Sequence, residues 1–191
     1  VILLTLSICA TAQAQISGDS WMEDLWDTPN SRGELFQNRR LRDIVIPGTH
    51  DSATYALTNV GAPGSNAYLA ALAALPGISG DIIIGYAEAQ SLPVYQQLAT
   101  GARFLDLRFA KYGGGYRAHH SLLGSSHVEV FADIKRFLEE GHDKEVIILR
   151  FNAMIDMESD DHNEFVADVF SEFRQWMVPK LSGLNATPGD L

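Results

Sequence analysis

The apolar segment at residues 145–151 (EVIILRF) is the feature that most constrains the fold of this chain. A nearly continuous apolar run is typical of a strand that is buried on both faces of a parallel sheet. An amphipathic helix is predicted before it, over residues 126–140, with Ser126 as the N-cap. The apolar stripe of that helix consists of Val128, Phe131, Ile134, Phe137 and Leu138. Another helix is predicted after the strand, over residues 160–176, where apolar side chains recur at helical spacing.

Three more strands are predicted earlier in the chain, at residues 41–46, 102–109 and 116–120. The first is expected to end at Pro47-Gly48, and a run of glycines too short for a helix joins the second to the third. Alternation along the second strand places one side-chain set on each face. Phe104, Asp106 and Arg108 share one face, and Arg103, Leu105, Leu107 and Phe109 share the other.

Short helices are predicted at residues 20–26 and 91–98, and Gly101 is expected to stop the second of them. Residues 58–85 are rich in glycine and proline and form a long insertion, within which residues 67–75 are expected to form a short apolar helix. We expect this helix to pack on the domain, because it lacks the flanking lysines and arginines of a membrane-surface anchor. The alternation of strands and helices predicts an α/β fold with a mostly parallel sheet, equivalent to about half of a barrel.

The N-terminus and the overall charge bear on location and partners. Residues 1–10 are apolar, and Ala12 and Ala14 have the spacing of a signal-peptidase site, so residues 1–14 are predicted to be part of a secretory signal peptide. Cys9 is the only cysteine, so the mature chain would have neither disulfides nor cysteine-based metal or redox chemistry. The net charge of −10 argues against nucleic acid as a partner and against simple electrostatic adhesion to anionic lipid.

Polar groups follow or end three of the predicted strands: His50 with Asp51, Asp106 with Arg108, and His119 with His120. Two histidines and an arginine suit phosphoryl transfer. One imidazole takes a proton from an attacking hydroxyl, the other protonates the leaving oxygen, and the guanidinium binds the phosphate oxygens. A metal site is the competing interpretation, since histidine and aspartate are also ligands. Arg108 weighs against it, because a fixed cation beside Asp106 repels a divalent ion, and we expect no cofactor.

Four ordered motifs resemble the X domain of phosphatidylinositol-specific phospholipase C. They lie at residues 46–52 (IPGTHDS), 90–98 (QSLPVYQQL), 101–108 (GARFLDLR) and 119–124 (HHSLLG). The resemblance extends over residues 41–151 and is closest to bacterial-type and related secreted eukaryotic members. It implies that residues 15–191 are the N-terminal part of a distorted TIM barrel that cleaves phosphatidylinositol-type lipids.

Carried onto this sequence, the resemblance implies that His50 is the general base and His120 the general acid, with Asp51 as the partner of His120. It also implies that Arg108 binds the phosphate and stabilises the transition state, and that Asp106 belongs to the same site. The inositol 2-hydroxyl attacks phosphorus and releases diacylglycerol and a cyclic inositol phosphate, which water can open. Calcium-dependent members carry a carboxylate at the position of Arg108, so this chain resembles the metal-independent type.

Two positions depart from the family pattern. Ser121 stands where a glycine usually follows the second histidine. Asn152 stands at the end of the fourth predicted strand, where bacterial members tend to have lysine, and we include it with Arg108 and Asp106 among the substrate-binding residues. An acidic partner for His50 is expected in later strands, beyond Leu191.

The predicted function is therefore a secreted phosphodiesterase that acts on a phosphoinositide or inositol-phosphate substrate and touches the membrane surface transiently. No protein partner is indicated. A catalytically weak lipid- or sugar-phosphate-binding module on the same scaffold is the alternative, because fold alone does not fix function. A metal-dependent glycerophosphodiesterase-like enzyme is a third possibility, and it would need a carboxylate where Arg108 stands.

Overall fold

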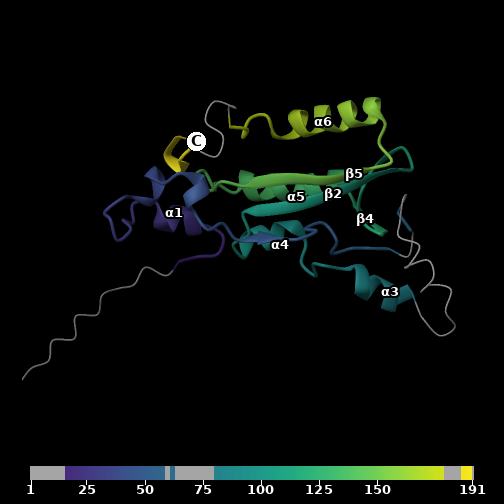
Figure 1. Cartoon of the computed structure of the whole chain (residues 1–191), viewed down its shortest axis with the longest axis horizontal. Coiled ribbons are helices and arrows are strands. Elements are labelled where there is room, and N and C mark those ends of the chain that lie inside the picture. The colour runs from purple at the N-terminus through teal and green to yellow at the C-terminus, as the bar shows by residue number, and fades with distance from the viewer. Residues whose placement is uncertain (1–15, 59–60, 63–79, 179–185, 191) are drawn as a thin grey trace, which may run out of the picture.

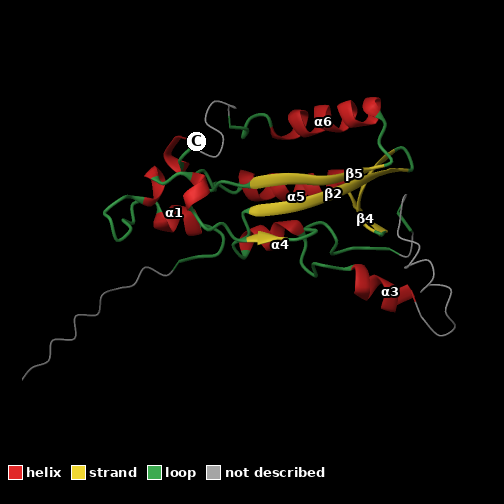
Figure 2. Ribbon diagram, viewed as in Figure 1, coloured by secondary structure: helices red, strands yellow, loops and turns green. Residues whose placement is uncertain are grey.

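A five-stranded sheet in which β2 is the central strand organises the fold (Figures 1 and 2). The computed structural model describes residues 16–58, 61–62, 80–178 and 186–190. Strand β1 pairs with β2 in parallel, β3 pairs with β2 and β4 in antiparallel fashion, and β5 runs parallel to β2 on its other side. The strands are β1 (Gly48–Thr49), β2 (Phe104–Tyr112), β3 (Gly115–His120), β4 (Leu122–Ser126) and β5 (Ile148–Ile155).

In the described part of the chain, the α-helices are α1 (Trp21–Leu25), α3 (Gly80–Ala87), α4 (Val94–Ala99), α5 (His127–Glu139) and α6 (Ser159–Phe173). Helices α4, α5 and α6 pack on one face of the sheet. Single 3₁₀ turns in the described residues are η1 (Phe36–Asn38), η2 (Leu41–Asp43) and η4 (Pro188–Asp190). The elements form an α/β half-barrel, which confirms the predicted fold class. Within the described residues, none of the helices is long and apolar enough to cross a membrane.

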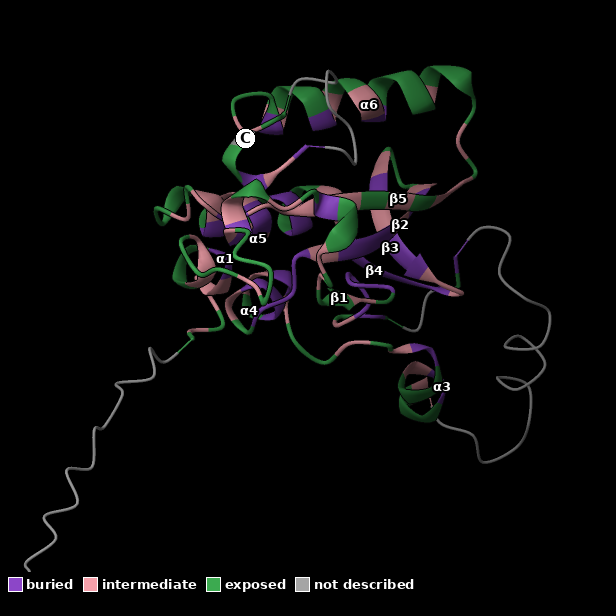
Figure 3. Ribbon diagram, turned by 60° about the vertical axis from the view of Figure 1, so that its left-hand side comes forward, coloured by how far each residue is buried: buried purple, intermediate pink, exposed green. Residues whose placement is uncertain are grey.

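The predicted two-faced character of β2 is confirmed. Leu105, Leu107 and Phe109 are fully buried and join one core with residues of α4, α5 and α6 (Figure 3). Aromatic rings fill the centre of that core, where the ring centroids of Phe109 and Phe165 lie 5.3 Å apart. The opposite face of β2 carries Asp106 and Arg108 and looks into the half-barrel. The strand therefore separates an apolar layer from a polar one.

Helix α5 begins where the sequence predicts, at a capping box in which Ser126 and Glu129 bond to each other's backbone N–H groups. Phe131, Ile134 and Phe137 are buried as predicted, together with Val130. The assignment of Val128 to the stripe was wrong, because its side chain is 62% exposed. Val128 lies two residues, or about 200° around the helix, from the buried Val130.

The predicted strand at residues 41–46 was wrong. Leu41–Asp43 form a 3₁₀ turn, and Val45 is 93% exposed. Pairing with β2 begins only at Gly48, so Pro47-Gly48 opens the strand rather than ending it. A Cβ atom on Gly48 would lie 2.9 Å from the Cβ and the carbonyl oxygen of Phe104, so the two strands approach too closely for a larger residue.

Other boundaries also differ from the prediction. Strand β5 begins at Ile148, and only one of its faces is covered by the helices. Leu149 and Phe151 pack on the core, whereas Arg150 and Asn152 are exposed on the other face, so burial on both faces was wrong here. Strand β4 and helix α3 were not predicted, and α4 begins at Val94 after Pro93 rather than near residue 91. The predicted signal segment and the predicted helix at residues 67–75 lie outside the described residues.

A buried ion pair joins the N-terminal segment to the sheet. Arg103 Nε donates to Glu145 Oε2 at 2.7 Å, and both side chains are fully buried. Glu145 Oε1 accepts from the backbone N–H groups of Met22 and Glu23, at the start of α1. Arg103 also donates to the carbonyl oxygen of Asp19 at 2.6 Å. Each partner thus has hydrogen bonds beyond the pair itself, which a buried charge requires.

Candidate active site

The loop after β1 carries the first two candidate residues, and hydrogen bonds hold it against β2 and α4. The N–H of Ser52 donates to the carbonyl oxygen of Asp106 at 2.8 Å. Gln97 of α4 donates to the carbonyl oxygen of Ser52 at 2.7 Å. Asp51 has a φ of 47°, a left-handed conformation that aspartate tolerates better than most residues. This turn directs the Asp51 carboxylate into the molecule, where it is almost completely buried.

His50 lies between two carboxylates. Its Nδ1 is 3.0 Å from Asp106 Oδ2, and its Nε2 is 3.2 Å from Asp51 Oδ2. The ring is 66% exposed, so the imidazole is open to solvent while both of its nitrogens have partners. Gln90 holds the backbone of the same residue by donating to the His50 carbonyl oxygen at 2.9 Å. A carboxylate partner for His50 is thus present on β2, within the described chain. The expected partner beyond Leu191 remains a prediction.

His120, at the end of β3, also lies beside Asp51. Its Nε2 lies 3.5 Å from Asp51 Oδ2, and its Nδ1 lies 2.7 Å from the carbonyl oxygen of Ala87. Since a carbonyl oxygen can only accept, Nδ1 of His120 carries a proton and Nε2 faces the cluster. Ala87 is the last residue of α3, so that helix fixes the orientation of the second imidazole.

Arg108 completes the cluster from β2. Its Nε lies 2.5 Å from Asp51 Oδ1, and its Nη2 lies 3.7 Å from Asp106 Oδ2. Two carboxylates and one guanidinium leave a formal excess of one negative charge, which a single imidazolium cancels. The structure therefore brings together five of the six predicted site residues: His50, Asp51, Asp106, Arg108 and His120.

His119, the neighbour of His120, has a different environment. Its ring is buried, and its Nε2 has no hydrogen-bond partner among the described residues. Burial, with smaller contributions from the charges of Arg108 and His120, lowers the pKa of His119 to about 4. A neutral, inaccessible imidazole is a poor proton donor near neutral pH. Geometry therefore agrees with the choice of His120 rather than His119 as the candidate acid.

Asn152 is the predicted residue that the structure does not join to this cluster. It lies at an irregularity of β5, where Phe151 pairs with Leu107 but Ala153 pairs with Arg108. The Asn152 side chain is exposed and its Oδ1 accepts from Arg150 Nη2 at 2.9 Å. It shares the inward-looking face of the sheet with the cluster, one strand away from Arg108.

Ser121 has a φ of 61°, in the left-handed region that favours glycine. It forms the turn between β3 and β4, and its carbonyl oxygen accepts from the N–H of Ala62 at 2.9 Å. This conformation gives a physical reason for the glycine that the family resemblance led us to expect after the second histidine. In this chain the turn forms with serine, at a cost in backbone strain.

His50, Asp51 and Asp106 offer ligand atoms within 4.8 Å of one another, a spacing that would also suit a metal ion. Arg108 contacts both of these carboxylates, and a divalent cation there would face the fixed positive charge of the guanidinium. The donor set therefore fits an anionic ligand beside Arg108 better than a metal ion.

Three contributors to the site were missed by reasoning from the sequence alone. The Ala87 carbonyl acts through backbone, and no side-chain pattern reveals it. Gln90 lies in one of the matched motifs, but nothing in its neighbours indicates that it binds the His50 backbone. Arg150 alternates with the core residues Leu149 and Phe151, and this alternation is the signal that could have placed it on the inward face.

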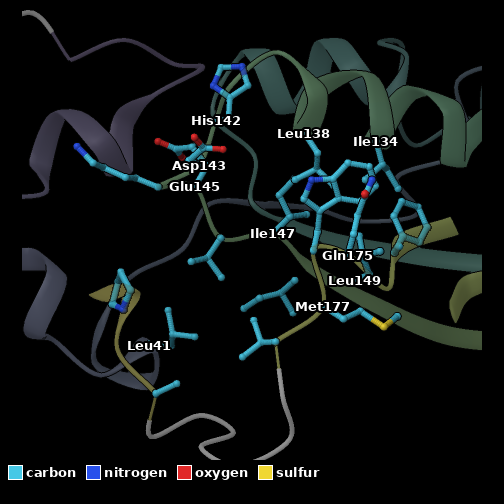
Figure 4. A pocket seen from close by; sticks show the side chains of 18 of the residues that line it. Leu41, Ile134, Leu138, His142, Asp143, Glu145, Ile147, Leu149, Gln175 and Met177 are labelled. Carbon is cyan, nitrogen blue, oxygen red and sulfur yellow. The ribbon is translucent and has the colours of Figure 1, made fainter. Parts of the chain in front are cut away.

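A cavity with a volume of about 630 Å³ lies elsewhere, between β5, α5 and α6 (Figure 4). Its lining is mainly apolar and includes Ile134, Leu149 and Val169. None of the five clustered residues lines it. The candidate site is thus an open polar surface of the half-barrel rather than this cavity.

Comparison with known proteins supports a family assignment. No family model matches the chain. Human PI-PLC X domain-containing protein 1 is 30% identical over 177 residues, which cover 86% of this chain and 51% of that protein. The zebrafish protein of the same name is also 30% identical over 177 residues, covering 85% of this chain and 52% of that protein. The chain thus spans about half the length of these relatives.

Solved structures agree on the fold. The phosphatidylinositol-specific phospholipase C of Listeria monocytogenes matches with a TM-score of 0.57 and 21% identity, over 92% of this chain and 54% of that one. A Staphylococcus aureus enzyme of the same type matches with a TM-score of 0.57 and 19% identity, over 91% of this chain and 50% of that one. Both place the half-barrel in the distorted TIM barrel of these enzymes. Together with the named relatives, these similarities support the assignment of this chain to the PI-PLC X-domain family.

Proposed function

We propose that this domain cleaves the phosphodiester of phosphatidylinositol-type lipids by acid–base catalysis, with His50 as the base and His120 as the acid. The observation that carries the proposal is the convergence of two imidazole Nε2 atoms on one place beside Arg108. Each Nε2 lies within 3.5 Å of Asp51 Oδ2, and each Nδ1 is held by an acceptor, Asp106 in one case and the Ala87 carbonyl in the other.

The pairing of each Nδ1 defines what each ring can do. With Nδ1–H donating to Asp106, neutral His50 has a lone pair on Nε2, which is the form of a general base. With Nδ1–H donating to the carbonyl oxygen of Ala87, His120 becomes a proton donor at Nε2 when it is an imidazolium. Binding alone would not require two such imidazoles beside the same carboxylate and guanidinium.

The chemistry then follows in two steps. His50 Nε2 takes the proton of the inositol 2-hydroxyl as its oxygen bonds to phosphorus, and His120 gives its Nε2 proton to the diacylglycerol oxygen as the P–O bond breaks. The products are diacylglycerol and a cyclic inositol phosphate. Water opens the cyclic phosphate in the second step, with the two imidazoles exchanging roles.

During these steps Asp51 would orient the guanidinium of Arg108, and Arg108 would bind the phosphate. Asp51 Oδ1 pairs with Nε of Arg108, and Nη2 lies 3.7 Å from Asp106 Oδ2, too far for a hydrogen bond. The terminal N–H groups can therefore turn to phosphate oxygens as their charge increases. Substrate binding would exchange the contacts of both Nε2 atoms with Asp51 for contacts with the reacting oxygens. In this scheme the guanidinium supplies the positive charge, and the reaction proceeds without a metal ion.

The test is turnover of phosphatidylinositol vesicles by the intact protein with a metal chelator present, followed by phosphorus NMR. We expect a cyclic inositol phosphate, and a loss of about 10²–10⁴-fold in rate for both His50→Ala and His120→Ala. His162→Ala, which removes an exposed imidazole on α6, is the matched control and should keep the full rate. Vesicle binding without turnover would refute the enzyme in favour of the binding module. Activity that required added calcium would refute the role of Arg108.

A further inference from the structure

Strands β2 and β5 lie side by side (Figure 1), and their parallel register pairs Arg150 of β5 with Asp106 of β2. Paired residues on neighbouring strands direct their side chains to the same face of the sheet. The residues on either side of Arg150, Leu149 and Phe151, pack on the helical core, so Arg150 projects to the opposite face. That face carries the cluster of His50, Asp51, Arg108 and His120, so Arg150 borders the candidate active site.

The two carboxylate oxygens of Asp106 differ in their contacts within the described residues. Its Oδ2 contacts His50 and Arg108, at 3.0 and 3.7 Å. Its Oδ1 is buried and has no hydrogen-bond partner among the residues that the structure describes. Asp106 as a whole is only 5% exposed. A buried carboxylate oxygen without a donor is unfavourable, and in a functional site it indicates a place for a donor that arrives with a ligand.

Arg150 has unused donors on the same face. Its only hydrogen bond within the described residues runs from Nη2 to Asn152 Oδ1, and it forms no ion pair with a carboxylate there. Its side chain is exposed. Paired strands are about 4.8 Å apart, a distance that a flexible guanidinium spans easily. The donors of Arg150 and the free acceptor of Asp106 can therefore act on one ligand group.

We propose that Arg150 and Asp106 Oδ1 together form a hydroxyl-binding subsite that recognises the polyol ring of the head group next to the phosphate. A hydroxyl donates to the carboxylate oxygen and accepts from the guanidinium, so it satisfies both partners at once. A second phosphate group at this place would be repelled by Asp106. The inference rests on the proposed function, because that function places the scissile phosphate at Arg108, one strand away. Arg150 then discriminates among head groups, while Arg108 and the two histidines act on the phosphate.

Binding of soluble head groups to the intact protein, measured by calorimetry, tests the subsite without requiring turnover. The ligands are inositol 1-phosphate and glycerol 1-phosphate, which share the phosphate but differ in the ring hydroxyls. We expect the parent protein to prefer inositol 1-phosphate by at least about tenfold, in line with hydrogen bonds to charged groups. Arg150→Met should abolish that preference and change glycerol phosphate affinity less than about twofold. Arg136→Gln, on the exposed side of α5, is the matched loss of charge and should leave both affinities unchanged.

Three outcomes would overturn the inference. Arg150→Met could bind both ligands with the same affinities as Arg136→Gln, which would show that Arg150 does not contact the head group. Arg150→Met could lower the affinity for both ligands by the same factor, which would show that Arg150 attracts the shared phosphate and does not recognise the ring hydroxyls. Inositol 1,4-bisphosphate could bind much more tightly than inositol 1-phosphate, with Arg150→Met abolishing the difference, which makes the subsite an anion site. Intact preferential binding without lipid turnover would instead refute the proposed function and leave the subsite standing.

Discussion

His119 should make the stability of this domain fall below pH 6.5. Its pKa is lowered from 6.5 to about 4 in the folded chain, chiefly because the buried ring cannot accommodate a charge. In the unfolded chain the imidazole takes up a proton below about pH 6.5. The stabilising effect of neutral His119 is thus complete above pH 6.5 and is lost as the pH falls toward 4.

The magnitude follows from the same two values. Each pKa unit corresponds to about 1.36 kcal/mol, so the difference between 6.5 and about 4 amounts to at most about 3 kcal/mol. A loss of this size is a large share of the stability of an ordinary domain.

The assay is urea unfolding of the parent protein and of His119→Gln at half-unit steps from pH 4 to pH 8. Glutamine has no ionisable group, so the variant should lose less stability between pH 6.5 and pH 4, by about 2 to 3 kcal/mol. Its stability at pH 8 sets the baseline and is compared separately. Parallel pH profiles for the two proteins would show that burial of His119 does not shift its titration, and they would refute the reasoning.

Three further predictions concern the fold and the N-terminus. Arg103→Met should lower the free energy of unfolding in urea by about 3 to 5 kcal/mol, because it leaves the buried Glu145 charge without its partner; an unchanged midpoint would contradict this. Ser121→Gly should raise the unfolding free energy by about 1 kcal/mol by relieving the left-handed backbone, and a loss of stability would count against strain at that turn. We also propose that the protein is secreted after cleavage behind Ala14. Mass spectrometry of the exported protein should then find Gln15 at the N-terminus. A protein that is retained in the cell and keeps residues 1–14 would disprove this proposal.

Features that depend on neighbouring residues were predictable from the sequence. The two faces of β2 follow from strict alternation between apolar and polar side chains, and the start of α5 follows from the Ser126–Glu129 capping box. The position of β1 was not predictable, because its pairing depends on how closely Gly48 approaches Phe104, a contact across a long stretch of chain. Val45 looks like a core residue in sequence and is exposed, since the strand begins only after Pro47.

In the candidate site, too, some features could be predicted from the sequence and others depend on contacts between distant parts of the chain. The residue types in the motifs suffice to nominate His50, Asp51, Asp106, Arg108 and His120, because imidazole, carboxylate and guanidinium groups define the chemistry. The proton on His120 Nδ1 is set by the Ala87 carbonyl, a backbone group at the end of a helix that the sequence did not predict. The place of Arg150 opposite Asp106 depends on the register between β2 and β5, which becomes known only when the strands are paired.

The assignment of His120 as the proton donor is tested most directly by the rate of His120→Ala on two substrates that differ only in the leaving group. The natural substrate releases an alcohol that needs a proton, whereas an inositol nitrophenyl phosphate releases a stable anion. We expect His120→Ala to lose about 10²–10⁴-fold in rate on the lipid and far less on the nitrophenyl ester, while His50→Ala loses similar factors on both. Equal losses for His120→Ala on both substrates would contradict its role as the acid.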